Sequence, residues 1–156
     1  MYAIYVAVCE EKRLYVGMTK QYRLKERMNE HWNPNFLATR WTTKYPIVEF
    51  VCTFPVGSKK KTLLVEHQLT ERLMEIYGLD AVRGGNYVMW KEGGTWWVHP
   101  KLRHIPRFTR FWASLSARSF VEFARNDPFL FEVRKLHQSF SGSPLPLEPG
   151  QDEHQP

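Results

Sequence analysis

Cysteine is scarce in this chain. Its 156 residues include two, Cys9 and Cys52, each inside an apolar run typical of a strand. Disulfide-stapled secreted domains contain more cysteines, so this pattern favours two buried thiols in a reducing compartment. The two cysteines lie far apart in the sequence, which argues against a structural zinc site.

Long apolar runs are also lacking. None approaches the roughly 18 residues that a membrane-spanning helix requires. The opening residues, Met-Tyr-Ala-Ile, include no basic leader of the kind that precedes a secretory signal. We therefore expect a soluble, cytoplasmic protein with no membrane partner, whose oligomeric state the sequence leaves open.

Acidic residues are missing from one stretch, residues 101–118, where Lys and Arg occur five times. Over the whole chain there are 22 Lys and Arg against 16 Asp and Glu, for a net charge of +6. A basic balance favours anionic partners, either nucleic acid or a membrane surface. Hydrophobic residues make up 43% of the chain, which predicts a substantial folded core.

The glycine pattern excludes two common nucleotide-binding loops. Gly84 and Gly85 lack the remaining spacing of a P-loop or of a dinucleotide fingerprint. Gly17 lies near the end of a predicted strand, where it leaves room for a close approach to the backbone.

Apolar patterning predicts the order of elements in the first half of the chain. Strands are expected over residues 2–8, 13–19 and 46–54, with a polar hairpin between the first two. A helix is expected over 20–32, with Leu24, Met28 and Trp32 as its buried stripe. Residues 33–45 are interpreted as a loop.

The helix expected over residues 62–77 carries an unusual carboxylate. Its predicted apolar face contains Leu63, Leu69, Leu73, Ile76 and Tyr77. Glu66 falls in the middle of that face, whereas Glu71 points the other way and is expected to be solvated. A carboxylate on a core-facing side must be paired, protonated or bound to a metal.

The C-terminal part differs in composition. A single helix is expected over residues 107–125, with a basic stripe of Arg107, Arg118 and Arg125. A second helix is expected from Asp127-Pro128 to about residue 140. The chain is thus divided into a domain over 1–90, a basic, aromatic-rich helical extension over 91–140 and a disordered tail over 141–156.

Several polar residues of the first domain suit phosphodiester hydrolysis. Tyr5 and Tyr15 lie on neighbouring predicted strands and can position or deprotonate water. Arg27 suits bidentate phosphate contact. A single carboxylate such as Glu66 can hold Mg²⁺ that keeps most of its waters.

These residues also resemble a known family. Ala3-Ile4-Tyr5, Tyr15-Val16-Gly17 ten residues further on, and then Arg27, His31, Glu66 and Asn86 are similar in order to the GIY-YIG nuclease domain. The resemblance covers about residues 2–90. Residues 40–46 and 77–85 further resemble stretches of one GIY-YIG-like subgroup. Ala3 stands where the family has its first glycine, and Val16 replaces an isoleucine.

The resemblance implies a fold, a reaction and a set of roles. The fold would be α/β, of the α+β type, with a small three-stranded antiparallel sheet flanked by helices and followed by the C-terminal helical segment. The activity would be hydrolysis of DNA, single- or double-stranded, with one divalent metal, Mg²⁺ or Mn²⁺. Glu66 would bind the metal and Arg27 the phosphate, while Tyr5 and Tyr15 would position or activate water.

Two further residues take roles from the resemblance. His31 would assist the water or contact phosphate, and Asn86 would close the site from behind. Candidate nucleic-acid contacts are Arg23, Arg40, Lys44, Arg103, Arg107, Arg110 and Arg118.

Other readings of the same residues remain open. The tyrosines also fit ordinary aromatics at the edge of a core, and His31 fits a satisfied structural histidine. Ala3 together with the basic C-terminal part favours a non-catalytic nucleic-acid-binding module. A third alternative is a membrane-surface protein that uses the Phe/Trp/Arg-rich helix.

Overall fold

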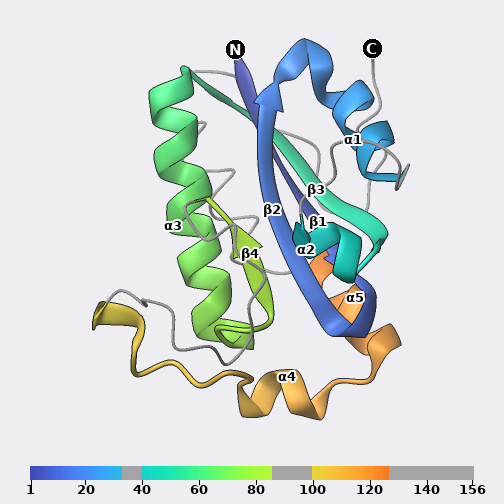
Figure 1. The fold of residues 1–156 in the computed structure, drawn as a ribbon, viewed down its shortest axis with the longest axis vertical. Coiled ribbons are helices and arrows are strands. Elements are labelled where there is room, and N and C mark those ends of the chain that lie inside the picture. Colours follow the sequence, from blue (N-terminus) through green and yellow to red (C-terminus); the bar gives the residue numbers. More distant parts are fainter. Residues whose placement is uncertain (33–39, 86–99, 127–156) are drawn as a thin grey trace.

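The computed structural model describes residues 1–32, 40–85 and 100–126 (Figure 1). The strands are β1 (Tyr2–Cys9), β2 (Arg13–Lys20), β3 (Ile47–Gly57) and β4 (Val82–Gly84). The α-helices are α1 (Leu24–Trp32), α2 (Arg40–Lys44), α3 (Lys59–Tyr77), α4 (Arg110–Ser114) and α5 (Ala117–Arg125). Short 3-10 turns are η1 (Glu10–Lys12), η2 (Gln21–Arg23) and η3 (Pro100–Leu102).

The four strands form one mixed sheet in the order β3-β1-β2-β4. β1 pairs antiparallel with β2 and β3, whereas β4 runs parallel to β2. The mixed α/β class is confirmed. The sheet differs from the predicted three antiparallel strands because it contains a fourth strand, β4, which is parallel to β2. β4 is only three residues long and contains a glycine, so it has no alternating apolar pattern. Its pairing depends on the preceding turn, where Leu14 donates to the carbonyl of Ala81 at 2.7 Å.

The two faces of the sheet carry different side chains because successive residues of a strand point to opposite sides. One face contributes Ile4, Val6 and Val8 of β1 to a core that also contains α3, α4 and α5 side chains. The other contributes Tyr5, Ala7 and Cys9 to a smaller cluster with Trp41 and Tyr45. In Figure 1, α3 lies on one side of the strands and α1 and α2 on the other.

The C-terminal helices share the larger core. Phe120 and Ala124 of α5 are buried there, and the ring centroids of Phe120 and Tyr77 lie 4.9 Å apart. The single helix expected over 107–125 is wrong. Leu115 has an extended backbone, and the Ser116 side chain accepts from the amide of Ser119, so a new helix begins at Ala117.

A helix also replaces part of a predicted loop. Residues 40–44 form α2, in which Trp41 is fully buried and donates from its indole Nε1 to the carbonyl of Leu14 at 3.0 Å. Burial of this tryptophan against the sheet stabilises a helical turn that local sequence does not favour. Residues 33–39 of that loop lie outside the described part of the chain, as do the second C-terminal helix and the tail expected over 127–156.

Three burial predictions on the helices are also wrong. Leu63 is 47% exposed, whereas Glu71, expected in solvent, is buried. On α1 the outermost member of the predicted stripe, Trp32, is 51% exposed while His31 is buried. A helical period identifies a stripe, but the neighbouring elements decide which stripe is covered.

Cys9 and Cys52 are both free and buried, as predicted. Among the helices within residues 1–32, 40–85 and 100–126, none combines the length and apolar character that crossing a membrane requires.

Candidate active site

Tyr5, Tyr15 and His31 form a buried cluster on the α1 side of the sheet. The Tyr5 and Tyr15 ring centroids lie 6.2 Å apart, and that of His31 lies 5.6 Å from Tyr5 and 5.4 Å from Tyr15. The Tyr5 hydroxyl is hydrogen-bonded to His31 Nε2 at 2.8 Å, while His31 Nδ1 faces Thr42 Oγ1 at 3.4 Å. The three side chains therefore converge although they come from β1, β2 and α1.

Gly17 creates the space that the Tyr5 ring occupies. The two residues are directly paired across β1 and β2. A Cβ built on Gly17 would overlap the Tyr5 ring. The close approach that the glycine allows is thus made by a side chain of the candidate site.

Burial controls the protonation of this cluster. It raises the pKa of Tyr5 to about 12, against an opposing effect of Arg27. Burial likewise raises the pKa of Tyr15 above its ordinary range. Burial and, to a lesser extent, the positive charge of Arg27 together lower the pKa of His31 to about 4, against an opposing effect of Glu30. At neutral pH the phenols are therefore protonated and the imidazole is neutral.

Glu66 is a buried carboxylate on α3, 7% exposed. Its Oε2 has no hydrogen-bond partner within the described structure. Burial raises the pKa of Glu66 to about 7, and a hydrogen bond from the Gly85 backbone opposes the rise. Its negative charge also contributes to the raised pKa values of Tyr5 and Tyr15, so the carboxylate lies within electrostatic reach of both phenols.

Gly84 and Gly85 allow the turn after Arg83 to approach both β2 and α3, the helix that contains Glu66. A side chain on Gly84 would overlap the Val16 carbonyl of β2, and one on Gly85 would lie 2.9 Å from the Cα of His67 on α3. Gly85 also has φ +55°, in the left-handed region. The turn is thus wedged between β2 and α3, which holds Glu66 beside the tyrosine strand.

Arg27 lies at the less buried side of the cluster. Its Nη1 forms an ion pair with Glu30 Oε2 at 2.8 Å, and Glu30 is shared with Arg23 at 3.4 Å. Arg27 also acts electrostatically on Tyr5, Tyr15 and His31. A phosphate bound by Arg27 would therefore compete with Glu30, a residue that the sequence did not identify.

The donor set fits one loosely held divalent cation. Glu66 supplies one carboxylate oxygen that has no other described partner. Within the described residues no three His, Cys, Asp or Glu side chains gather into a closed metal cage. A hard cation such as Mg²⁺ commonly binds through one or two carboxylates and keeps several waters, so a single carboxylate is a sufficient protein ligand.

The predicted nucleic-acid contacts do not form one stripe. Arg103, Arg110 and Arg118 are exposed, but Arg107 pairs with Asp80 at 2.6 Å and Arg118 with Glu122 at 3.5 Å. The stripe was also expected to include Arg125, which pairs with Glu49 at 2.6 Å. The break between α4 and α5 removes the continuous helix on which the stripe depended.

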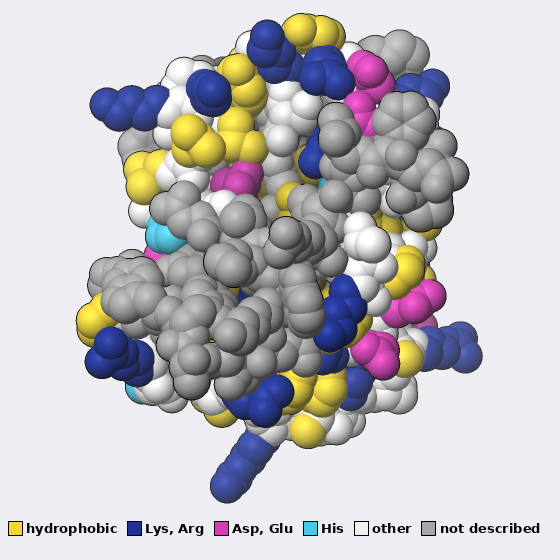
Figure 2. All heavy atoms as spheres, viewed as in Figure 1, with side chains coloured by type: hydrophobic (Ala, Val, Ile, Leu, Met, Phe, Trp, Pro, Cys, Tyr) yellow, Lys and Arg dark blue, Asp and Glu magenta, His cyan; other side chains and the backbone are white. Residues whose placement is uncertain are grey.

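The other candidates are scattered. Arg23 and Lys44 are exposed, on η2 and α2. Asn86 and the side chain of Arg40 lie outside the described part of the chain. In Figure 2, the Lys and Arg side chains of the described residues lie at several separate places on one face.

A buried arginine supports the strand beside the cluster, and sequence reasoning gave it no role. Arg83 is 1% exposed, and its guanidinium lies 4.7 Å from the centroid of the Trp41 ring. It donates to the carbonyls of Leu79 and Val82 and pairs with Asp80 at 3.6 Å. Burial lowers its pKa to about 10. These contacts anchor β4, and only the tertiary structure reveals them.

Comparison with known proteins adds no family assignment. No protein-family model, no curated protein and no solved structure matches this chain. The groups available for chemistry at the cluster are two neutral phenols, a neutral imidazole, a guanidinium and a buried carboxylate.

Proposed function

We propose that this chain is a metal-dependent endonuclease, similar to GIY-YIG nucleases, that hydrolyses phosphodiester bonds in DNA. The observation that carries the proposal is the Glu66 carboxylate. It is buried with an oxygen that has no partner within the described residues, in electrostatic reach of Tyr5 and Tyr15. A carboxylate in such a place is costly unless it serves a ligand.

A divalent ion held by Glu66 would neutralise the charge that builds on the phosphate oxygens and the leaving oxygen. The residues of the chain supply the rest. Arg27 exchanges its Glu30 partner for the phosphate, which its planar guanidinium binds in bidentate fashion. Tyr15, kept protonated by burial, orients the water with its hydroxyl.

The Tyr5–His31 pair offers a path for the proton of the water. With the proton of neutral His31 on Nδ1, facing Thr42 Oγ1, Nε2 accepts a hydrogen bond from the Tyr5 hydroxyl. As the water oxygen bonds to phosphorus, the bond from phosphorus to the leaving oxygen breaks and that oxygen leaves with the electron pair. The water proton passes to the Tyr5 oxygen and the Tyr5 proton passes to His31 Nε2. Tyr5 ends as a neutral phenol and His31 as an imidazolium.

A non-catalytic nucleic-acid-binding module is the second candidate. It is favoured by Ala3, which is 1% exposed within β1 where the family has glycine. Such a module would bind oligonucleotides with strong salt dependence and leave them intact.

Cleavage of end-labelled oligonucleotides separates the two candidates. Single-stranded and duplex DNA are incubated with the protein and Mg²⁺, Mn²⁺ or EDTA. We expect cutting only with the metals, and a loss of about 100-fold or more in Glu66→Gln, since the neutral amide no longer balances the cation. Glu75→Gln is the matched control, because Glu75 is an exposed glutamate of the same helix. Cutting that Glu66→Gln retains in full would refute the assignment, and intact DNA bound by a folded wild type would favour the module.

A further inference from the structure

One end of the sheet gathers basic side chains from four elements, β2, η2, α1 and α3. Tyr2 pairs with Lys20 of β2 and with Gly57 of β3, so the residues after each of them flank β1 at the same end. There η2 leads into α1, and Ser58 leads into α3 (Figure 1). We call this surface the strand-end cap and define it by Lys20, Tyr22, Arg23, Lys25, Lys59, Lys60, Lys61, Leu63 and Leu64.

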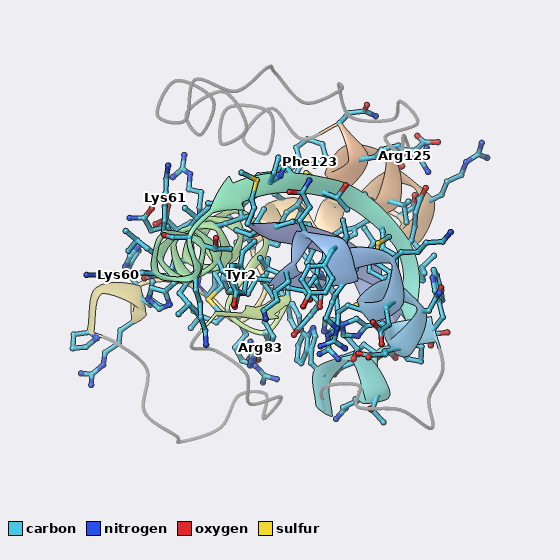
Figure 3. All side chains as sticks on the ribbon, turned by 90° about the horizontal axis from the view of Figure 1, so that it is seen from above. Tyr2, Lys60, Lys61, Arg83, Phe123 and Arg125 are labelled. Carbon is cyan, nitrogen blue, oxygen red and sulfur yellow. The ribbon has the colours of Figure 1, made fainter. Side chains whose placement is uncertain are left out.

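Positive charge exceeds negative charge in the cap. Five of its six cations are exposed, and the first turn of α3 contains three lysines and no acidic residue. Glu26 and Glu30 are the nearby carboxylates of α1, and both pair with Arg23. Lys59 and Lys60 have no ion pair with any carboxylate in the described ranges. Figure 3 shows Lys60 and Lys61 extending outward from α3.

Large apolar side chains are exposed among these cations. Tyr22 is 79% exposed, and the Nζ of Lys20 lies 5.8 Å from the centroid of its ring. Leu63 and Leu64 are 47% and 57% exposed. Ammonium groups match phosphates, and an exposed aromatic ring offers a stacking surface for a base. A duplex hides the faces of its bases, so this combination suits an unpaired strand.

The cap continues into the candidate active site along both helices. Lys59 and Leu63 precede Glu66 by seven and three residues on α3, spacings that place all three near one side of the helix. Arg23 precedes Arg27 by one helical turn. A strand lying on the cap would therefore reach Arg27 from one helix and Glu66 from the other.

The C-terminal arginines occupy the opposite end of the sheet. Lys12, in the hairpin that joins β1 to β2, donates to the carbonyls of Trp112 and Leu115 at 3.0 and 2.6 Å. This places α4 beside the hairpin, and the eight residues of β1 separate it from the cap by roughly 20 Å. Arg125 is at the same end as α4, because it pairs with Glu49, which lies opposite Val8 near the hairpin end of β1. Of these arginines, Arg107, Arg118 and Arg125 already pair with carboxylates.

We infer that the strand-end cap binds a single nucleic-acid strand and directs it to the candidate active site. The sequence had instead predicted most of the nucleic-acid contacts among the C-terminal arginines. The inference rests on the proposed function, because it presupposes a nucleic-acid substrate. Lys59 and Lys60 contact phosphates, and Tyr22 stacks on a base.

Fluorescence anisotropy tests the cap without catalysis. The parent is full-length Glu66→Gln in EDTA, and the probes are a labelled oligothymidine and a labelled hairpin duplex over a salt series. Lys59→Ser with Lys60→Ser is compared with Arg103→Ser with Arg110→Ser, which removes the same charge from exposed positions at the other end. We expect the lysine pair to weaken oligothymidine binding about tenfold and to lower the salt slope by roughly one, and the arginine pair to change affinity less than about twofold.

Tyr22 gives an independent test of strand type. Tyr22→Ala should weaken oligothymidine binding about fivefold or more and leave the duplex unchanged, while Tyr22→Phe should bind like the parent because its ring still stacks. An equal effect of Tyr22→Ala on both probes would overturn the preference for a single strand. All substituted side chains in the cap are exposed, and circular dichroism of each variant verifies folding.

The outcomes separate this inference from the proposed function. Equal losses from the lysine and arginine pairs would show that only net charge matters and would overturn the cap. Cap variants that bind like the parent, while the wild type cuts DNA, would overturn the cap and leave the nuclease proposal intact. A parent that binds neither probe and a wild type that cuts nothing would overturn both. Tighter binding to phosphatidylserine vesicles than to oligothymidine would assign the cap to membranes.

Discussion

The two faces of the central sheet are built from alternate residues of the same strands, yet they differ in chemistry. Toward α3, β1 presents Ile4, Val6 and Val8, which pack in a core of aliphatic and aromatic side chains. Toward α1 and α2 it presents Tyr5, whose hydroxyl bonds to a buried histidine. The first face holds the fold together, and the second holds polar groups in place.

The difference shows how a small domain separates stability from chemistry. Apolar burial contributes about 25 cal/mol per Å² and tolerates no unpaired polar atoms. The α1 side instead keeps hydroxyl, imidazole and guanidinium groups in mutual contact, where burial shifts their pKa values. Glu66 is the exception, because it stands on α3 but acts on the tyrosines of the other face.

The largest expected loss of stability comes from a substitution in the core on the α3 face of the sheet. Leu69 is 1% exposed in the core, so Leu69→Ala should lower the free energy of unfolding by about 2–5 kcal/mol. Tyr5→Phe on the other face should lower it by only about 1 kcal/mol, the worth of one hydrogen bond, while cleavage falls sharply. Urea unfolding and the oligonucleotide assay measure the two effects. Equal stability losses would contradict the division between the faces.

Burial of Glu66 should make the stability of the fold depend on pH. Its folded pKa of about 7 exceeds its ordinary value of 4.5, so the protonated carboxyl favours folding at low pH. That contribution is lost as the pH rises from 4.5 through 7, because the ionised form must then stay buried. Glu66→Gln cannot ionise and should be more stable than wild type at pH 8 in EDTA, by up to about 3 kcal/mol, and equally stable near pH 4.5.

Thermal unfolding at several pH values measures the effect of Glu66. The exposed Glu75→Gln serves as control and should show no such pH-dependent gain. A constant difference between Glu66→Gln and wild type at all pH values would mean that the carboxylate is solvated in the folded state.

Gly17 of β2 has no side chain, which leaves room for the ring of Tyr5 on the neighbouring strand β1. Gly17→Ala should lower the free energy of unfolding by about 1–3 kcal/mol, because the new methyl overlaps the Tyr5 ring. Combining it with Tyr5→Leu removes the overlap, so the double variant should be more stable than the sum of the two single effects predicts. Additive effects would show that the ring does not meet the methyl.

The smallest expected effect concerns Glu30, which competes with phosphate for Arg27. Glu30→Gln frees Arg27 and Arg23 from an ion-pair partner, so oligonucleotide affinity at low salt should rise about two- to fivefold. Glu26→Gln is the matched control, since Glu26 pairs with Arg23 alone among the described contacts. Anisotropy titrations provide the measurement, and a loss of affinity would argue that Glu30 orients Arg27 for phosphate.

Much of the framework follows from the sequence. The two hairpin strands, the third strand and α3 have clear apolar periods, and the buried place of Glu66 follows from its position in that period. The missed elements have weak local signals. β4 is too short for a period, and α2 depends on the burial of Trp41. Exposure of Leu63 and burial of Glu71 were mispredicted because a helical period does not say which neighbours cover each side.

The sequence alone determined which residue types alternate on each strand, because the pleat of a strand sends successive side chains to opposite faces. It therefore determined that Tyr5 and Tyr15 point to the opposite face of their strands from the aliphatic residues that follow them, Val6 and Val16. Only the tertiary structure decided what those hydroxyls meet. His31 meets Tyr5, and the Gly85 backbone meets Glu66, through contacts between segments that are separated in the sequence. Local sequence propensity cannot predict such contacts. The ion pair of Arg27 with Glu30 is local to α1, but its position at the edge of the cluster depends on how α1 packs on the sheet.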